Sequence, residues 1–509
     1  MLARLRSAAV LGIDAYLVEV EVDLANGLPS FSTVGLPQAA VKEGKERVTA
    51  ALVNSGYEFP LRRITVNLAP ADTPKSGSGF DLAVALGILV ASGQLSESAV
   101  ASVVFLGELG LEGDLRPVRG ALPMALAARH AGGSGLVLPR QNVAEAAVVE
   151  GVRVFGAASL REVTRHLAGT CVIAPADGRG AADAVVDPGD GADFAEVKGQ
   201  LAAKRALEVA AAGGHNVLMI GPPGAGKTML ARRLPSILPR APLDEALEIT
   251  KVHSVAGLLP AGAALLSRRP FRAPHHTISE AGLVGGGSSP RPGEVSLAHG
   301  GVLFLDELPE FHRHVLEVLR QPLEDGVVTL SRAAARLTFP ARFTLVAAMN
   351  PCPCGHLGSL LQQCRCGPGV IERYRARISG PLLDRIDMHL RVPAVPYLEL
   401  AMEGATESSA DIRARVEAAR NRQRQRFAGQ AGVHANAHMS SREVRRHCRQ
   451  SGEVAGILHA AVERLGLSAR GCTRVLKVAR TIADLAGSEE LAPGHVREAI
   501  QYRAADKRA

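Results

Sequence analysis

Aromatic residues are scarce in this chain. They make up 3% of its 509 residues, and tryptophan is absent. Many proteins hold single-stranded nucleic acid by stacking bases on aromatic rings, so this scarcity disfavours that mode of binding. Apolar runs are also short, because Gly, Arg or Asp interrupts each before the roughly 18 residues that a membrane-spanning helix needs. Residues 1–14 begin like a signal peptide, but Asp14 ends the apolar segment and no clear cleavage site follows. We therefore expect a cytoplasmic protein without a membrane partner.

Cysteine is sparse, and most of it is clustered. The 7 cysteines are not spread as in the disulfide framework of a secreted domain. Two C-x-C pairs could offer four thiolates to a tetrahedral Zn²⁺ ion; free thiols in a turn-rich loop are the alternative. The possible zinc ligands are Cys352, Cys354, Cys364 and Cys366, with His356 as a weaker choice.

Positive charge exceeds negative charge, with 58 Lys and Arg against 50 Asp and Glu, a formal net charge of +8. Such a balance suits an acidic partner such as nucleic acid, although charge alone indicates only non-specific affinity. Arginines crowd the segment between Asp411 and Arg449. A DNA-facing role and a solvated helix face are both open for that segment.

A glycine-rich octapeptide matches G-x-x-x-x-G-K-[ST] and stands between an apolar run, residues 217–220, and a helical pattern, residues 229–234. In this context backbone N–H groups turn toward nucleotide phosphates, Lys227 reaches the β- and γ-phosphate oxygens, and the Thr228 hydroxyl ligates Mg²⁺. The predicted ATP-binding residues are Gly221, Pro222, Pro223, Gly224, Ala225, Gly226, Lys227 and Thr228.

A second nucleotide-site motif follows at residues 301–307, an apolar run that ends in Asp306 and Glu307. The run is typical of a buried parallel strand. Asp306 at its end would hold Mg²⁺ through water, and Glu307 would polarise the water that attacks the γ-phosphate. Two acids in this order favour ATP hydrolysis over nucleotide binding alone.

Three domains fit the length and the pattern of the chain. Residues 172–195 are rich in Ala, Gly, Asp and Pro without periodicity and are predicted to be a linker. Residues 1–171 mix short strands with helices, as in an α+β or α/β domain. Residues 196–394 repeat the strand-then-helix order of a parallel sheet, and residues 395–509 are predicted to form an all-α lid.

The longest distinctive string runs from Arg269 to Thr277 (RPFRAPHHT) and continues through the glycine-rich residues 282–287 to Glu294. With the two nucleotide motifs, it resembles the ComM/YifB family of magnesium-chelatase-like AAA+ ATPases over nearly the whole chain. The resemblance implies a P-loop AAA+ parallel-sheet core with an all-α C-terminal lid. It also implies ATP and Mg²⁺ as cofactors and a ring-shaped homo-oligomer, expected to be a hexamer.

The AAA+ pattern can be carried over residue by residue. Asn350 ends the strand of residues 343–349 and corresponds to sensor 1, an amide near the γ-phosphate. Arg385 is similar to an arginine finger supplied to a neighbouring subunit, which makes hydrolysis depend on assembly. Arg470 fits sensor 2, with Arg474 as the competing choice. Helix-surface charges are the alternative for these arginines.

Two segments of the family connect the motor to DNA. Residues 282–296 correspond to the helix-2 insert, and residues 326–343 resemble the presensor hairpin; in related helicases these loops line the pore. Arg332 and Arg336 flank the expected hairpin tip, where they would contact phosphate without reading sequence. His275 and His276, just before the insert, could be metal or catalytic residues, but packing near the nucleotide or the pore loops is the simpler interpretation.

The N-terminal domain resembles the Lon-protease-like S5-type fold, through residues 74–81 and 107–113. Proteolysis by that fold needs a serine activated by a lysine. The nucleophile position falls on Gly79 and the lysine position on Leu122, while Lys75 with Ser76 or Ser78 is a poor substitute. We therefore expect a scaffold or a DNA-facing collar.

The resemblance favours an ATP-driven motor on single-stranded or branched DNA, with helicase or branch-migration activity in recombination of transforming DNA. A protein-remodelling motor, as in magnesium chelatase, is the alternative, and a Lon-like protease is the third possibility.

Overall fold

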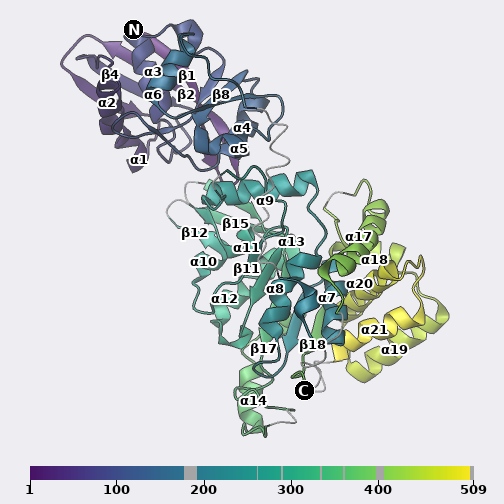
Figure 1. Cartoon of the computed structure of the whole chain (residues 1–509). Helices are drawn as coiled ribbons and strands as arrows, with labels where there is room; N and C mark the ends of the chain where they lie inside the picture. Colours follow the sequence, from purple (N-terminus) through teal and green to yellow (C-terminus); the bar gives the residue numbers. More distant parts are fainter. Residues whose placement is uncertain are drawn as a thin grey trace.

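A computed structural model describes residues 1–176, 192–260, 262–287, 290–332, 335–358, 362–396, 406–430 and 432–504. The N-terminal part lies above a second sheet-containing part, and the C-terminal helices flank that second part (Figure 1). The linker predicted over residues 172–195 falls largely on residues 177–191, which lie outside the described residues. Among the described residues, no helix is both long enough and apolar enough to cross a membrane.

The N-terminal part is built on a mixed seven-stranded sheet in the order β3-β4-β2-β1-β5-β8-β9. The signal-like start of the chain is its strand β1, whose alternating burial places one face on the core. The strands are β1 (Leu2–Leu11), β2 (Asp14–Ala25), β3 (Ser30–Val34), β4 (Arg63–Ala69), β5 (Val103–Phe105), β8 (Gly135–Pro139) and β9 (Arg153–Ala157), with a small pair β6 (Glu108–Leu109) and β7 (Leu115–Arg116).

Helices cover this sheet. Two consecutive helical segments meet at Glu43, and the helix over residues 81–91 is buried along its whole length. The helices are α1 (Ala39–Lys42), α2 (Gly44–Asn54), α3 (Asp81–Ala91), α4 (Ala121–His130), α5 (Val143–Ala146) and α6 (Leu160–Leu167).

The second part holds a five-stranded sheet in the order β11-β14-β17-β10-β18, and every neighbouring pair is parallel. Its central strands are buried at every position or nearly so, which explains their unbroken apolar sequences. The strands are β10 (Val217–Ile220), β11 (Phe271–Arg272), β14 (Val302–Leu305), β17 (Thr344–Met349) and β18 (Met388–Arg391). The fold is therefore the expected α/β parallel-sheet core.

Helices α7 to α15 surround this sheet. They are α7 (Leu201–Gly213), α8 (Lys227–Ile237), α9 (Leu243–Ala256), α12 (Arg313–Glu317), α13 (Arg320–Asp325), α14 (Pro368–Arg375) and α15 (Gly380–Leu383). The insert contains α10 (Glu280–Val284), β12 (Gly285–Gly286), β13 (Arg291–Pro292) and α11 (Glu294–Leu297). The expected hairpin is present as β15 (Val327–Arg332) and β16 (Ala335–Pro340).

The C-terminal part is all-α, as expected: α17 (Ser409–Arg426), α18 (Ser441–His447), α19 (Gly452–Leu465), α20 (Ala469–Leu485) and α21 (Pro493–Ala504). Four of these helices begin after a serine whose hydroxyl accepts a backbone N–H of the first turn, a favourable N-cap. The helices share one continuous apolar core with strands β10 and β14, so this part is packed on the sheet.

The arginines of α17 hold the protein together internally. Arg415 pairs with Glu208 of α7, and Arg426 pairs with Asp484 of α20, whose carboxylate is fully buried. Arg420 donates to the backbone carbonyl of Ala211. These three arginines therefore have partners within the chain, while the Arg415 side chain is still 42% exposed. The DNA-facing role of the segment stays a prediction.

The N-terminal part rests on α9 of the second part. The Lys251 ammonium lies 2.5 Å from the Asp14 carboxylate, and the Ser254 hydroxyl donates to Glu145 at 2.6 Å. Burial raises the pKa of Glu145, and the hydrogen bonds from Ser254 and Asn142 offset part of that shift. Leu247 of α9 packs against an apolar cluster of the N-terminal part. Polar and apolar contacts therefore join the two parts.

Candidate active site

The glycine-rich loop connects β10 to α8 at the carboxyl edge of the parallel sheet, where nucleotides bind in such folds. Gly224 and Gly226 have φ angles of 75° and 84°, in the left-handed region that side chains avoid. Helix α8 begins at Lys227 directly after the loop. The free N–H groups and positive end of that helix favour an anion at this point.

Lys227 is buried at the centre of the loop. Its ammonium donates to the carbonyls of Gly221 and Pro222 at 2.7 and 2.9 Å and to Oδ1 of Asn350 at 3.2 Å. Burial lowers the pKa of Lys227, while the nearby charges of Asp306 and Glu307 act in the opposite direction. The structure thus brings the P-loop lysine and the predicted sensor 1 amide into direct contact.

Thr228 and Asp306 also meet. The threonine hydroxyl donates to Oδ2 of Asp306 at 2.6 Å, although the two residues lie 78 positions apart in the sequence. A hydroxyl and a carboxylate are oxygen ligands of the kind that Mg²⁺ prefers. These two side chains fit the expected magnesium ion, which would neutralise phosphate charge when bound.

Glu307 follows in an unusual backbone conformation. Its φ angle of 53° is in the left-handed region, and its N–H donates to Oδ1 of Asp306 at 3.0 Å. Its side chain is 58% exposed, and Oε2 lies 3.6 Å from Nδ1 of His276. His275 instead contacts the hydroxyl of Thr277. The sequence alone did not separate the roles of the two histidines.

Arg385 lies at the opposite edge of the sheet. Its backbone carbonyl accepts a hydrogen bond from the side chain of Asn216, the residue just before β10, whereas the phosphate loop follows β10. The guanidinium is buried, pairs with Glu324 and donates to the carbonyl of Pro381. Arg385 therefore does not reach the nucleotide loop of its own chain.

The two arginines proposed for sensor 2 differ in their partners. Arg474 lies 2.5 Å from the buried Asp387 carboxylate. Burial alone would raise the pKa of Asp387, but His215 and Arg474 outweigh it and hold that pKa well below its usual range. Arg470 is exposed and lines the same cavity of about 590 Å³ as Arg385. Because Arg474 is held in an internal ion pair, Arg470 is the better placed of the two for a ligand.

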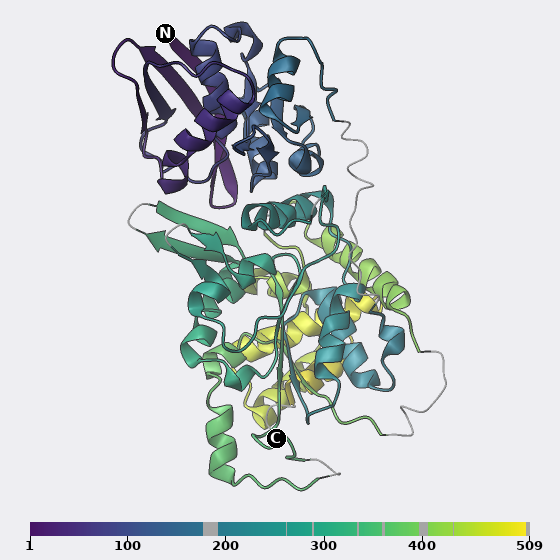
Figure 2. The same ribbon diagram turned by 60° about the vertical axis from the view of Figure 1, so that its left-hand side comes forward.

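The hairpin places Arg336 on an exposed position of β16, opposite Ser331. The side chain of Arg332 lies outside the described residues. The β1–β2 turn of the N-terminal part approaches the same strand: a Cβ built on Gly12 would lie 3.8 Å from a side-chain carbon of Leu337. Figure 2 shows the hairpin extending beneath the N-terminal part.

No serine–lysine pair forms in the described N-terminal part. The Ser78 hydroxyl donates to the carboxylate of Glu108, and the buried Lys75 ammonium has no hydrogen-bond partner. Gly79 carries no nucleophile, and Leu122 is fully buried on α4. The expectation that this part lacks Lon-type proteolytic chemistry stays a prediction.

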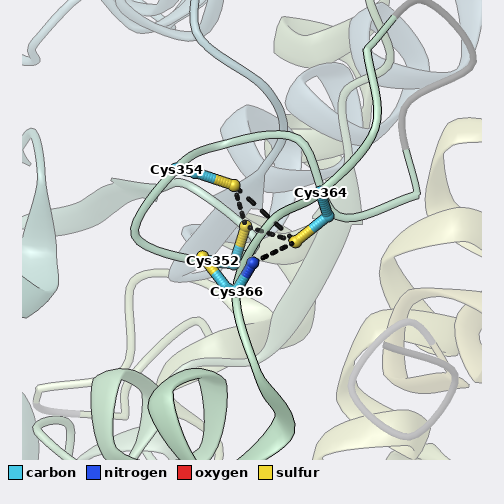
Figure 3. A group of neighbouring side chains, drawn as sticks. All are labelled: Cys352, Cys354, Cys364 and Cys366. Atoms are coloured by element: carbon cyan, nitrogen blue, oxygen red, sulfur yellow. Dashed lines mark hydrogen bonds between the residues drawn. The ribbon is translucent and has the colours of Figure 1, made fainter.

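The clustered cysteines converge in the loop between β17 and α14 (Figure 3). The Cys352 sulfur lies 3.4 Å from that of Cys354 and 3.7 Å from that of Cys364, too far for disulfides. The sulfur atoms of all four, Cys366 included, lie within 4.8 Å of one another. Zn–S bonds of about 2.3 Å place tetrahedral sulfurs about 3.8 Å apart, so the cluster has suitable dimensions for Zn²⁺.

Backbone hydrogen bonds and a glycine turn also shape the cysteine loop. The N–H groups of His356 and Arg365 donate to the Cys354 sulfur and lower its pKa to about 6. Gly355 turns with a φ angle of 81°, and a Cβ there would lie 2.5 Å from the ring of Pro223. The cysteine loop therefore packs directly on the nucleotide loop.

Comparison with known proteins agrees with this geometry. A family model described as magnesium chelatase, subunit ChlI, matches residues 193–400. The model of the subunit ChlI C-terminal region matches residues 406–503, and that of subunit ChlI of Mg-chelatase matches residues 20–142.

Full-length relatives extend the similarity. The chain is 46% identical over 505 residues to competence protein ComM of Haemophilus influenzae. The aligned residues cover 99% of this chain and 97% of that protein. It is 44% identical over 507 residues to YifB of Salmonella typhimurium, over 99% of this chain and 98% of that protein. Lon protease 2 of Bacillus subtilis is 35% identical over 154 residues, 28% of this chain and 26% of that protein.

The fold and the site define a P-loop ATPase of the AAA+ class. Within that class, the chain belongs to the ComM/YifB family of magnesium-chelatase-like AAA+ ATPases.

Replacing Glu307 with Gln should leave ATP binding near normal and slow turnover by at least about a hundredfold, because the amide cannot accept the proton of the attacking water. Single-turnover hydrolysis and equilibrium nucleotide binding would measure the two effects. Glu310→Gln, which changes a nearby acid paired with Arg377, serves as the control. Lys227→Ala should lose binding as well as turnover. Normal hydrolysis by Glu307→Gln would reassign the base.

Proposed function

We propose that this chain forms a ring, with a hexamer expected, that couples ATP hydrolysis to movement along DNA. Its activity would be helicase or branch migration on branched DNA during homologous recombination of transforming DNA. The name of the relative from Haemophilus influenzae, competence protein ComM, supports this assignment. ATP and Mg²⁺ are the cofactors of the motor.

One observation carries the proposal: the nucleotide loop and the arginines occupy opposite edges of the sheet. Strand β10 spans Val217–Ile220, and at about 3.3 Å per residue its first and last Cα atoms lie about 10 Å apart. Lys227 follows one end, whereas Arg385 is bonded to Asn216 at the other. Arg470 lines a cavity with Arg385. The exposed Arg470 would face a neighbouring nucleotide, whereas the buried Arg385 would have to exchange Glu324 for that nucleotide. A head-to-tail contact of that kind forms a ring when its rotation closes.

The DNA part of the proposal rests on charge and on exposed loops. The net charge is +8, and Arg336 is exposed on the hairpin. A guanidinium there would contact phosphate, and the scarcity of aromatic side chains favours tracking of the backbone over base stacking. The insert is the second element proposed to reach DNA.

A protein-remodelling motor is the second proposal. All three matching family models describe magnesium chelatase. In that case the insert and the hairpin would grip a polypeptide, and DNA would not change the rate of hydrolysis.

We also propose that the four clustered cysteines hold one Zn²⁺ ion. Thiolate ligands in a tetrahedron suit this ion, which would supply a structural crosslink. The crosslink would hold the cysteine loop against Pro223 of the nucleotide loop.

A complementation experiment tests the neighbour's role. Arg385→Ala and Lys227→Ala proteins should each be inactive, because one lacks the donated arginine and the other lacks the phosphate-binding lysine. An equal mixture should recover activity at about a quarter of the interfaces, where an intact loop meets an intact arginine. Steady-state ATPase rates before and after mixing measure this recovery. Absence of recovery in rings shown to be mixed would place both residues in one subunit's site.

A DNA experiment tests the motor's track. ATPase rate should rise with forked or Holliday-junction DNA, and labelled strands should be displaced only with ATP. Arg336→Ala should weaken DNA binding and reduce its salt dependence by about one phosphate contact. Arg497→Ala, in an exposed ion pair with Glu453, is the matched control. Hydrolysis that is indifferent to DNA would favour the remodelling motor.

Elemental mass spectrometry tests the zinc proposal. The purified protein should contain one zinc per chain, and Cys364→Ser should lose it, because three thiolates form an incomplete tetrahedron. The KM for ATP should rise in that variant as the loop beside Pro223 loosens. Cys171→Ser, at an exposed isolated cysteine, should keep the metal. If the purified protein contains no zinc and has a normal KM for ATP, the zinc proposal is wrong and the four cysteines are free thiols.

A further inference from the structure

A cavity of about 100 Å³ opens at the amino edge of the parallel sheet. Its walls are residues that precede strands β10, β11, β14 and β17, together with residues of α9 and of the C-terminal part. The nucleotide loop lies at the carboxyl edge of the same sheet, so the two sites are separate. Basic side chains dominate the wall of the cavity: Arg269, Arg342, Arg420, His299, His434 and His438.

The cavity wall also contains two carboxylates, and each already has a basic partner. Glu245 accepts a hydrogen bond from Arg269 at 2.8 Å. Oε2 of Glu248 lies 3.2 Å from Nε2 of His299. These two acids are therefore engaged with one arginine and one histidine, and the other basic groups of the wall keep their charge or their donors for a ligand.

The two remaining arginines contact neutral groups. The guanidinium of Arg342 lies 2.9 Å from Nε2 of His434, and that of Arg420 donates to the carbonyls of Ala211 and His434 at 3.1 and 3.2 Å. The buried Nε of Arg420 has no hydrogen-bond partner among the described residues. Burial, followed by the charge of Arg269, lowers the pKa of Arg420. Positive charge is thus concentrated here, and an anion would relieve it.

The shape of the cavity limits the size of such an anion. Sites for drug-sized ligands measure roughly 300–1,000 Å³, so this cavity suits a single small ion and is too small for a nucleotide. Glycines line part of the wall. Gly214 has a φ angle of 69°, and a Cβ there would lie 3.4 Å from a terminal nitrogen of Arg420. The oxygens of a tetrahedral oxyanion are strong acceptors for guanidinium N–H groups.

We propose that this cavity binds inorganic phosphate, held between Arg342 and Arg420. Arg342 directly precedes the strand region of β17, and Arg420 belongs to α17, so the bound ion joins the C-terminal part to the sheet beside α9. The proposal goes beyond the proposed function, because it needs neither hydrolysis nor DNA. Arg342 and His438 also border the larger cavity of Arg385 and Arg470, and the experiment separates the two cavities.

Calorimetric titration with inorganic phosphate tests the site in the full-length chain carrying Lys227→Ala, which removes the phosphate-binding lysine of the nucleotide loop. We expect saturable binding of one phosphate per chain. Adding Arg342→Gln or Arg420→Gln should weaken the affinity at least about tenfold, because each removes a charged donor. Arg413→Gln is the matched control: this arginine of α17 donates to the carbonyl of Ser236 and should keep the affinity within twofold.

Arg342 has an exposed side chain, so its variant keeps the test decisive if Arg420→Gln fails to fold. Sulfate, which has the same tetrahedral shape, should compete with phosphate. Equal affinity in Arg342→Gln and in the control would overturn the proposal. A loss in Arg470→Gln instead would place the ion in the larger cavity. Displacement of phosphate by single-stranded DNA would assign the site to a backbone phosphate and overturn the binding of the free ion.

Discussion

Because its strands are parallel, the central sheet has two chemically different edges, one where the strands begin and one where they end. The rest of the structure depends on the separation of these two edges. All strands of the central sheet point the same way, so the residues that follow them gather at one edge. The side chains of Lys227, Thr228, Asp306 and Asn350 meet there, although they follow three different strands of the sheet. Arg385 remains at the other edge. In the proposed ring, a subunit built in this way would carry half of one reaction centre and half of another.

Two ion pairs hold the arginines at that other edge, one with the buried carboxylate of Asp387 and one with the half-exposed carboxylate of Glu324. Asp387 fixes Arg474, and Glu324 neutralises Arg385, which would otherwise be a buried charge without a partner. An unpaired buried charge costs several kcal/mol, about 3–5 when one partner is removed. In the proposed ring, Arg385 would exchange Glu324 for another anion, and the phosphate of a neighbouring nucleotide would supply it.

Much of the fold could be predicted from the sequence because the signals are local. The apolar run before Gly221, the run before Asp306 and the strand before Asn350 each predict a strand of the observed sheet. Long-range partners could not be predicted. Glu145 and Ser254 are 109 positions apart, and nothing near either residue indicates the other. The contact of His276 with Glu307 had one available signal, since both follow neighbouring parallel strands and so approach the same edge.

The contact between the N-terminal part and helix α9 has a consequence for how the chain can be divided. Leu247 packs into the apolar cluster above it, and Glu145 is buried by the helix below. Separating the two parts would expose Leu247 to water and remove the hydrogen bond from Ser254 to Glu145, so each fragment would present an exposed contact surface. The N-terminal part and the sheet-containing part therefore share an interface that covers apolar and ionisable side chains of both.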